Sequence, residues 1–218
     1  MSLREQLEAR WRLAGERAPE FRRAYEALVR DLDQSGLTDS ARKTGEPMPE
    51  FELPNVEARL VASRELLARG PLVVSFFRGG WCPYCTLELK ALQQSLPEIE
   101  RHGATLVAIT PDTGAALAAA KRKNELGYEV LSDVDNGVGL ACGIIFRVPE
   151  AIRALYLRLD IDLGARHGNN TGEWLLPLPA TYIVDRDGII RHAELEPDFR
   201  RRMEPQEIIR VLGDIAAR

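Results

Sequence analysis

The chain has 218 residues, 45% of them hydrophobic, and a formal net charge of -4 at pH 7. This length allows one substantial domain with a sizeable core, and no basic tract favours nucleic acid as a partner. No apolar run approaches membrane-spanning length, and the N-terminus lacks the apolar segment of a signal peptide. The 3 cysteines, an odd number, argue against a secreted disulfide framework, so we expect a cytoplasmic protein.

The first part of the chain predicts two helices. Apolar residues recur at roughly helical spacing over residues 2–35, with breaks near Gly15 and Pro19. We therefore expect an N-terminal helical extension over residues 1–40 and a main domain over residues 44–218. The extension either lies on the main domain or mediates dimerisation, and the sequence leaves a homodimer open.

The main domain begins with a proline-rich segment and continues as an alternation of strands and helices. Residues 44–54 cannot be helical and predict a short edge strand. Strands alternating with helices predict parallel crossovers, so we expect an α/β fold with helices flanking a sheet. The alternating elements are strands over 71–77, 104–109 and 128–131 and helices over 84–101, 113–126 and 135–143.

The last third of the chain predicts an irregular region followed by a hairpin and a closing helix. Asp187-Gly188 lies between two apolar runs, which is a strong hairpin signal. In chain order, the expected elements are a helix over 149–159, a polar loop over 164–172, strands over 176–185 and 189–194, and a helix over 205–217.

The most informative feature is a pair of cysteines, Cys82 and Cys85, one helical turn apart directly after the strand over 71–77. A thiol at a helix N-terminus faces unpaired N–H groups and the positive end of the helix dipole, which both favour the thiolate. Because the thiolate is the nucleophile, the motif predicts a redox site, with Cys82 the more exposed sulfur. A zinc site would require a second Cys/His pair, so we expect no metal and no cofactor.

Three neighbours of the cysteines are candidates for binding substrate or activating the thiolate. The charge of Arg78 would lower a thiol pKa, with a solvated loop arginine as the ordinary alternative. Gly80 would let a backbone N–H approach an incoming oxygen, and Trp81 would pack over the sulfur pair. An ordinary turn glycine and a rim aromatic are the corresponding alternatives.

Three further residues carry weaker signals. We expect Cys142 to be simply a buried cysteine, because free cysteines are commonly just buried, with a resolving role as the minor alternative. Glu88 is expected to be a solvated helix residue, with a minor alternative as a proton shuttle. A lone loop histidine such as His167 usually has no catalytic role, and approach of His167 to the site is the minor alternative.

Three segments together resemble a known family. Segment 45–54, Gly-Glu-Pro-Met-Pro-Glu-Phe-Glu-Leu-Pro, resembles the entry segment of the peroxiredoxin (alkyl hydroperoxide reductase/thiol-specific antioxidant) family. Segment 76–85, Phe-Phe-Arg-Gly-Gly-Trp-Cys-Pro-Tyr-Cys, resembles the active-site segment of its peroxiredoxin-like branch. Segment 179–188, Pro-Ala-Thr-Tyr-Ile-Val-Asp-Arg-Asp-Gly, resembles the proline-initiated strand of the thioredoxin fold. The resemblance implies a three-layer thioredoxin-like fold with a central mixed sheet, and a cis-proline at Pro179 opposite the cysteines.

The sequence departs from the family at the residue that activates the peroxide. Typical peroxiredoxins carry Pro-x-x-x-Thr-x-x-Cys, in which the threonine hydroxyl helps to orient the peroxide. If Cys85 takes the place of that cysteine, Cys82 falls on the threonine and Arg78 on the proline. If Cys82 is the nucleophile, as in thioredoxin-type motifs, Cys85 is its resolving partner. We favour Cys82 as the attacking residue, and in either alignment the standard hydroxyl is absent.

The resemblance implies a thiol-dependent peroxidase that reduces hydrogen peroxide or organic hydroperoxides. Cys82 would become a sulfenic acid, Cys85 would condense with it to a disulfide, and a thioredoxin-like or small-thiol reductant would restore the pair. A thioredoxin- or glutaredoxin-like disulfide oxidoreductase and a non-enzymatic redox-sensing module are the alternatives.

Overall fold

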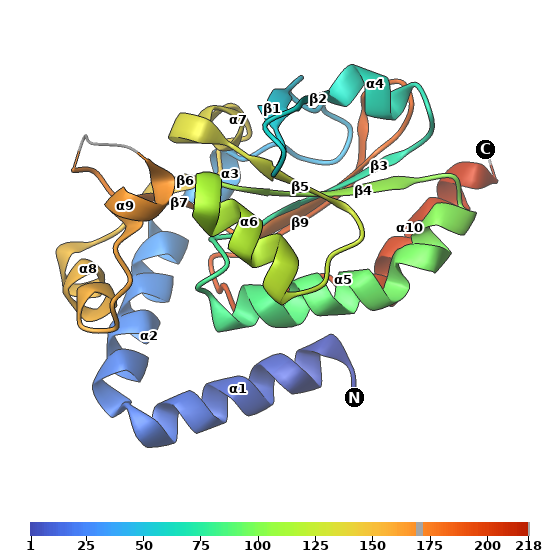
Figure 1. The fold of residues 1–218 in the computed structure, drawn as a ribbon. Helices are drawn as coiled ribbons and strands as arrows, with labels where there is room; N and C mark the ends of the chain where they lie inside the picture. The colour runs from blue at the N-terminus through green and yellow to red at the C-terminus, as the bar shows by residue number, and fades with distance from the viewer. Residues whose placement is uncertain (169–171, 218) are drawn as a thin grey trace.

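The centre of the structure is a five-stranded mixed sheet (Figure 1). The computed structural model describes residues 1–168 and 172–217. The strands are β3 (Leu72–Phe76), β4 (Thr105–Thr110), β5 (Glu129–Ser132), β8 (Ala180–Val184) and β9 (Ile190–Leu195). In the order β5-β4-β3-β8-β9, the first three are mutually parallel, whereas β8 is antiparallel to β3 and β9 is antiparallel to β8. This arrangement confirms the predicted α/β fold with a mixed sheet.

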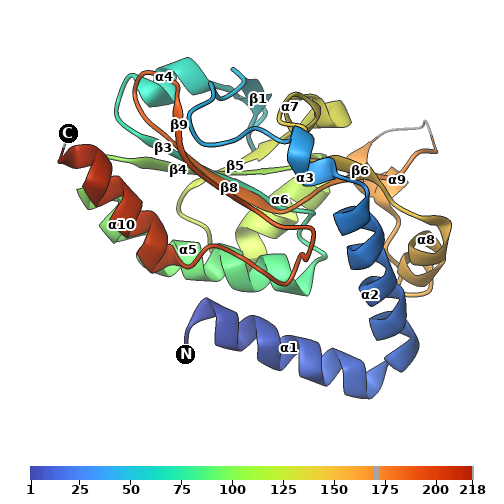
Figure 2. The same cartoon turned by 180° about the vertical axis from the view of Figure 1, so that it is seen from behind.

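Helices cover one face of this sheet, and shorter elements cover the other (Figures 1 and 2). On the first face lie α5 (Pro83–Arg101), α6 (Gly114–Lys123) and α10 (Pro205–Ala216). On the second lie α4 (Ser63–Leu67), α7 (Gly137–Ala141) and a small antiparallel sheet of β1 (Glu52–Pro54) and β2 (Leu60–Ala62). Every residue of β3 and β8 is buried, because both faces of the sheet are covered.

The N-terminal extension packs on the main domain. A capping box at Ser2 and Glu5 starts α1 (Leu3–Arg17), and Pro19 starts α2 (Pro19–Gln34) at a position that tolerates its missing N–H. Figure 2 shows α1 running beneath α5, while α2 turns towards α8 (Glu150–Leu157). The two helices contribute buried side chains to the same hydrophobic core as the sheet: Leu3, Leu7, Tyr25, Leu28 and Leu32.

Several short elements were not predicted from the sequence: α3 (Leu37–Ser40), β2, α4, β6 (Ile145–Arg147) and α9 (Leu163–His167). The strand expected over 176–185 is two strands, β8 and the shorter β7 (Leu175–Pro177), which pairs antiparallel with β6. The expected polar loop over 164–172 thus begins inside a helix, and its residues 169–171 lie outside the described residues. The expected helix over 135–143 is shorter, because Asp135 and Asn136 adopt positive φ angles before α7 begins. Within residues 1–168 and 172–217, no helix combines the length and apolarity needed to cross a membrane.

Candidate active site

The cysteine motif lies in the connection between β3 and α5. Cys82 is the N-cap of α5, and Pro83 occupies the first helical turn, where a missing N–H leaves no hydrogen bond unmade. Gly79 in this connection has a φ of +144°, and a Cβ there would lie 2.4 Å from Nε1 of Trp81. Because the Trp81 ring lies so close to the backbone of this connection, only glycine fits at position 79.

The Cys82 sulfur accepts hydrogen bonds that favour its ionised form. Nη2 of Arg78 lies 3.1 Å from Sγ, and the backbone N–H of Cys85 donates from 3.4 Å. Burial by itself raises the pKa of Cys82. The hydrogen bond from the Cys85 thiol and the charges of Arg78 and Arg202 outweigh burial and hold this pKa well below its usual range. The arrangement therefore favours a thiolate at Cys82.

Arg78 is held inside a shell of aromatic rings. Its side chain is buried, and Cζ lies 4.4 Å from the ring centroid of Phe199, 5.3 Å from that of Trp81 and 5.8 Å from that of Tyr25. The electron-rich ring faces attract the cation, and the rings exclude water from it. Its charge therefore acts on Cys82 with little screening. The alternative of a solvated loop arginine is wrong.

Cys85 faces a buried ion pair. Nε of Arg202 lies 2.8 Å from Oε2 of Glu88, both side chains are 2% exposed, and Nη2 of Arg202 lies 4.0 Å from the Cys85 Sγ. Burial, the hydrogen bond to Cys82 and the negative charge of Cys82 raise the pKa of Cys85 well above its usual range. Cys85 therefore stays a thiol when Cys82 is ionised. The expectation that Glu88 is solvated is wrong.

Neither sulfur reaches the surface. We expected Cys82 to be the more exposed residue of the pair, but Cys82 and Cys85 are both 0% exposed. Rings from distant segments fill the space around the motif, since Phe199 contacts Arg78 and Tyr156 of α8 lies 4.8 Å from Trp81 between ring centroids. Trp81 itself is half-buried and borders solvent, which agrees with the alternative of a rim aromatic.

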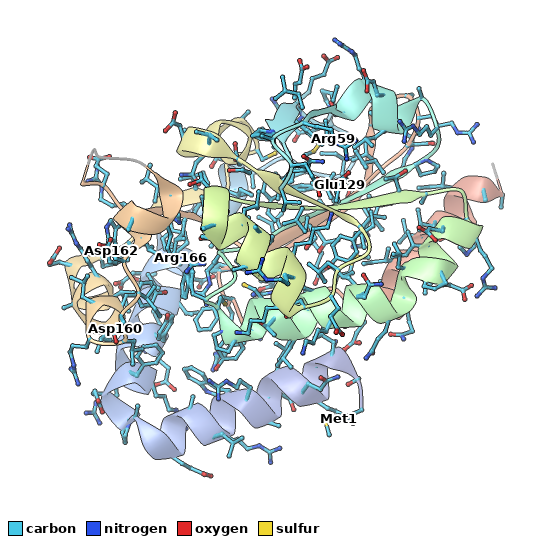
Figure 3. The ribbon with its side chains drawn as sticks, viewed as in Figure 1. Met1, Arg59, Glu129, Asp160, Asp162 and Arg166 are labelled. Atoms are coloured by element: carbon cyan, nitrogen blue, oxygen red, sulfur yellow. The ribbon has the colours of Figure 1, made fainter. Side chains whose placement is uncertain are left out.

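The backbone N–H of Gly80 is already used. It donates to Oδ2 of Asp112 over 2.8 Å. We expected this N–H to bind an incoming oxygen, but the bond to Asp112 already occupies it. Asp112 is in turn held by Arg166 of α9, whose Nη2 lies 2.7 Å from the same oxygen, and Figure 3 labels this arginine. Asp112, which lies just before α6, thus joins the connection before α5 to helix α9.

Pro179 lies between β7 and β8 with a trans peptide bond, because the structure contains no cis peptide among its described residues. The expected cis-proline is therefore wrong. The trans form is the intrinsically preferred one, even for a peptide bond that precedes proline. Pro179 is buried and lines a small pocket together with Glu88 and Arg202, on the Cys85 side of the motif.

Cys142 and His167 lie in other surroundings. Cys142 follows α7, and burial raises its pKa to about 12, with Asp133 adding to the rise. His167 is buried at the end of α9, where burial lowers its pKa to about 4 despite the nearby Asp112. Cys142 is thus a buried cysteine as expected, whereas His167 is an uncharged interior residue of a helix rather than of a loop.

Four residues around the motif escaped the sequence analysis: Tyr25, Tyr156, Phe199 and Arg202. They come from α2, α8 and the segment before α10, far from Cys82 in sequence. A run of three arginines over 200–202 was the only available signal. Composition alone does not reveal which of these arginines turns inward.

The chain is similar to proteins with peroxiredoxin and disulfide-interchange names. It is 28% identical over 147 residues to chloroplastic peroxiredoxin Q of Suaeda salsa, which covers 67% of this chain and 57% of that protein. It is 30% identical over 163 residues to the thiol:disulfide interchange protein DsbE of Pseudomonas aeruginosa, covering 74% of this chain and 70% of that protein. The match to peroxiredoxin Q thus spans less than two thirds of that relative.

Solved structures show the same fold. Peroxidoxin BcpB from Mycobacterium tuberculosis matches 79% of this chain and 97% of its own with a TM-score of 0.61 at 21% identity. Peroxiredoxin Q from Xanthomonas campestris matches 76% of this chain and 91% of its own with a TM-score of 0.57 at 17% identity. These likenesses confirm the predicted thioredoxin-like peroxiredoxin fold. The family model of AhpC/TSA matches residues 44–193, well over half of the sequence, and the chain belongs to the AhpC/TSA family.

Proposed function

We propose that this chain is a thiol-dependent peroxidase in which Cys82 attacks the peroxide and Cys85 resolves the product. The observation that carries this proposal is the contact of 3.1 Å between Nη2 of Arg78 and Sγ of Cys82 inside a shell of aromatic rings. A buried cation on a sulfur favours the nucleophilic thiolate. Similarity to peroxiredoxin Q supports a peroxide as the oxidant.

The reaction proceeds in two oxidative steps. The Cys82 thiolate attacks one peroxide oxygen, an S–O bond forms, the O–O bond breaks, and the sulfur is oxidised to a sulfenic acid. The other oxygen leaves as hydroxide or alkoxide and takes up a proton to become water or an alcohol. The Cys85 thiol then displaces the hydroxyl group as water, which forms a disulfide with Cys82. A dithiol of the thioredoxin type or two small thiols reduce that disulfide by exchange and are themselves oxidised.

Burial of both sulfurs favours a small oxidant. A hydrogen peroxide molecule or a small hydroperoxide can enter after local movement of side chains, and the half-buried Trp81 lies on the solvent side of the site. A protein disulfide needs far more of the surface to open before it reaches Cys82. The reductant must also reach the buried sulfurs. We therefore expect the first turn of α5 to unfold locally once the disulfide has formed.

Rapid mixing of the reduced protein with hydrogen peroxide tests the proposal. We expect each protein to consume one peroxide and lose the two thiols of Cys82 and Cys85, and we expect the fluorescence of Trp81 to change. The Cys82→Ser variant is the matched control and should lose no thiols. Unchanged thiols in the wild-type protein would remove the peroxidase proposal.

A disulfide oxidoreductase is the second candidate, and similarity to DsbE is the observation in its favour. An insulin-reduction assay separates the two. A peroxidase with buried sulfurs should reduce insulin poorly, whereas fast insulin reduction with slow peroxide consumption would favour the second candidate.

A further inference from the structure

Two tyrosine hydroxyls lie on the far side of Arg78 from the Cys82 sulfur. Nη1 of Arg78 lies 3.4 Å from the hydroxyl oxygen of Tyr156, and that oxygen lies 2.5 Å from the hydroxyl of Tyr25. Tyr156 is 1% exposed and Tyr25 is 2% exposed. One planar guanidinium thus holds the attacking sulfur through one terminal nitrogen and a phenol through the other.

The hydrogen-bond partners leave one hydroxyl proton of this pair unused. A guanidinium can only donate, so the Tyr156 oxygen accepts from Arg78, and the contact between the two tyrosines uses one hydroxyl proton. Among the described residues, the other proton has no acceptor. A buried donor without an acceptor destabilises the folded protein, so such a group in a native structure calls for an explanation.

The family's peroxide-activating threonine has no counterpart in this motif, which makes a hydroxyl beside Arg78 chemically significant. A peroxide that enters along the guanidinium would meet the Cys82 sulfur at one end and the Tyr156 hydroxyl at the other. Peroxide cleavage produces hydroxide or alkoxide, which are poor leaving groups unless they are protonated as the O–O bond breaks.

We propose that Tyr156, positioned by Tyr25, donates the proton to the oxygen that leaves when Cys82 attacks a peroxide. This inference rests on the proposed peroxidase function. The S–O bond forms as the O–O bond breaks, the leaving oxygen takes the Tyr156 proton to become water or an alcohol, and Cys82 becomes a sulfenic acid. The phenolate of Tyr156 next to Arg78 then recovers a proton from solvent.

The surroundings of Tyr156 suit a donor. Burial raises its pKa, although Arg78 and the hydrogen bond from Tyr25 oppose the rise, so the phenol is protonated before the reaction. The same two groups stabilise the phenolate that forms during it. Tyr25 belongs to α2, outside the family match over residues 44–193, so the N-terminal extension contributes a positioning residue to the site.

Comparison of two oxidants tests the assignment of Tyr156. Alkyl hydroperoxide leaves a basic alkoxide, whereas peracetic acid leaves a carboxylate that needs no proton. In Tyr156→Phe, we expect sulfenic acid formation with tert-butyl hydroperoxide to fall about 10²-fold and with peracetic acid to fall less than about threefold. Because both rates come from one preparation, an unfolded fraction cancels in their ratio.

Further variants complete the test. Tyr25→Phe should shift the same ratio in the same direction by a smaller factor, and it takes the place of Tyr156→Phe should that variant not fold. Tyr128→Phe is the matched control, because its hydroxyl bonds the carbonyl of Leu89 away from Arg78, and it should leave the ratio unchanged.

Three results would overturn the inference, and they are distinguishable. Equal falls with both oxidants in Tyr156→Phe mean that Tyr156 only supports the structure, and no fall with either oxidant means that it has no role. A wild-type protein that reacts with neither oxidant removes the peroxidase proposal itself. Unchanged alkylation of Cys82 by iodoacetamide in Tyr156→Phe supports the inference, because it shows that the thiolate is intact.

Discussion

Cys82 and Cys85 are one helical turn apart and equally buried, yet their pKa values move in opposite directions. The Cys82 sulfur lies 3.1 Å from the guanidinium of Arg78, which forms no ion pair with a carboxylate of residues 1–168 or 172–217. The Cys85 sulfur lies 4.0 Å from Arg202, whose charge is already matched by Glu88. Burial penalises both thiolates. The hydrogen bond between the two sulfurs lowers the pKa of Cys82 and raises that of Cys85, and the charge of Arg78 adds to the fall at Cys82.

This contrast shows why the helix N-terminus alone does not select the nucleophile. Cys82 is the N-cap of α5 and Cys85 lies in its first turn, but the backbone N–H of Cys85 and the cation of Arg78 converge on the sulfur of Cys82. The two sides of the motif therefore divide the chemistry. The Arg78 side stabilises the thiolate of Cys82, whereas burial and the hydrogen bond and charge of Cys82 keep Cys85 a thiol.

The largest expected effect comes from removing either sulfur. Cys82→Ser should abolish peroxide consumption, because the stabilised thiolate is lost. Cys85→Ser should still form a sulfenic acid, which accumulates because its resolving thiol is gone. Dimedone trapping and mass spectrometry measure both outcomes, and a sulfenic acid found only on Cys85 would reverse the assignment.

Replacement of the cation on the Cys82 side should have the next largest effect. In Arg78→Met, we expect the pKa of Cys82 to rise by about one to two units, so that its reaction below that pKa slows about ten- to a hundredfold. The sign follows from the thiolate fraction, which falls as the pKa rises above the pH. The rate measured against pH should show its midpoint displaced upwards.

Arg153→Met is the matched control for that change. Its guanidinium also lies over an aromatic ring, 4.9 Å from the centroid of Trp174, but it does not contact a cysteine. An equal loss of rate in both variants would mean that arginine–aromatic packing, rather than the charge on the sulfur, accounts for the effect.

The Cys85 side should respond in stability more than in the rate of attack. Glu88→Gln leaves the buried charge of Arg202 without its counter-ion, so the free energy of unfolding should fall by about 3–5 kcal/mol. Sulfenic acid formation at Cys82 should change much less than in Arg78→Met. Urea denaturation of the reduced protein measures the first quantity, and rapid mixing with peroxide measures the second.

A pair on the surface of the same helix supplies the control. Glu98 and Arg101 are 35% and 70% exposed, so Glu98→Gln should cost less than about 1 kcal/mol. A similar loss of stability in Glu98→Gln and Glu88→Gln would contradict the special position of the buried pair.

The smallest expected effect concerns the third cysteine. Burial raises the pKa of Cys142 to about 12, so this residue stays a thiol at neutral pH and lacks the reactivity of Cys82. Cys142→Ala should therefore leave the number of thiols lost per peroxide unchanged at two. If the wild-type protein loses more thiols per peroxide than the Cys142→Ala variant, Cys142 takes part in the reaction.

The order of the elements could be predicted from sequence because the signals are local. The run over 71–77 contains only apolar residues and Ser75, which fits a strand covered on both faces, and Asp187-Gly188 marks the hairpin of β8 and β9. Local spacing also identified the cysteine pair and its place at the start of a helix. Short elements such as β6 and β7 depend on pairing over a long sequence separation and give no such signal.

The surroundings of the sulfurs could not be predicted, for a physical reason. Arg78 looks the same in sequence whether it is solvated or enclosed, and the rings that enclose it come from α2 and from the segment before α10. The burial of Cys82 has the same origin. Pro179 was predicted in the cis form from its sequence neighbours, which do not determine the geometry of the connection.

Titration of the Cys82 thiol tests most directly whether Arg78 keeps this sulfur ionised. The ultraviolet absorbance of the thiolate can be followed against pH in a protein carrying Cys85→Ser and Cys142→Ala, with Arg78→Met added in a second sample. We predict a midpoint well below the free-cysteine pKa of about 8.5, and a higher midpoint once Arg78 is replaced. A midpoint at or above that value in the first sample, unmoved in the second, would contradict the account.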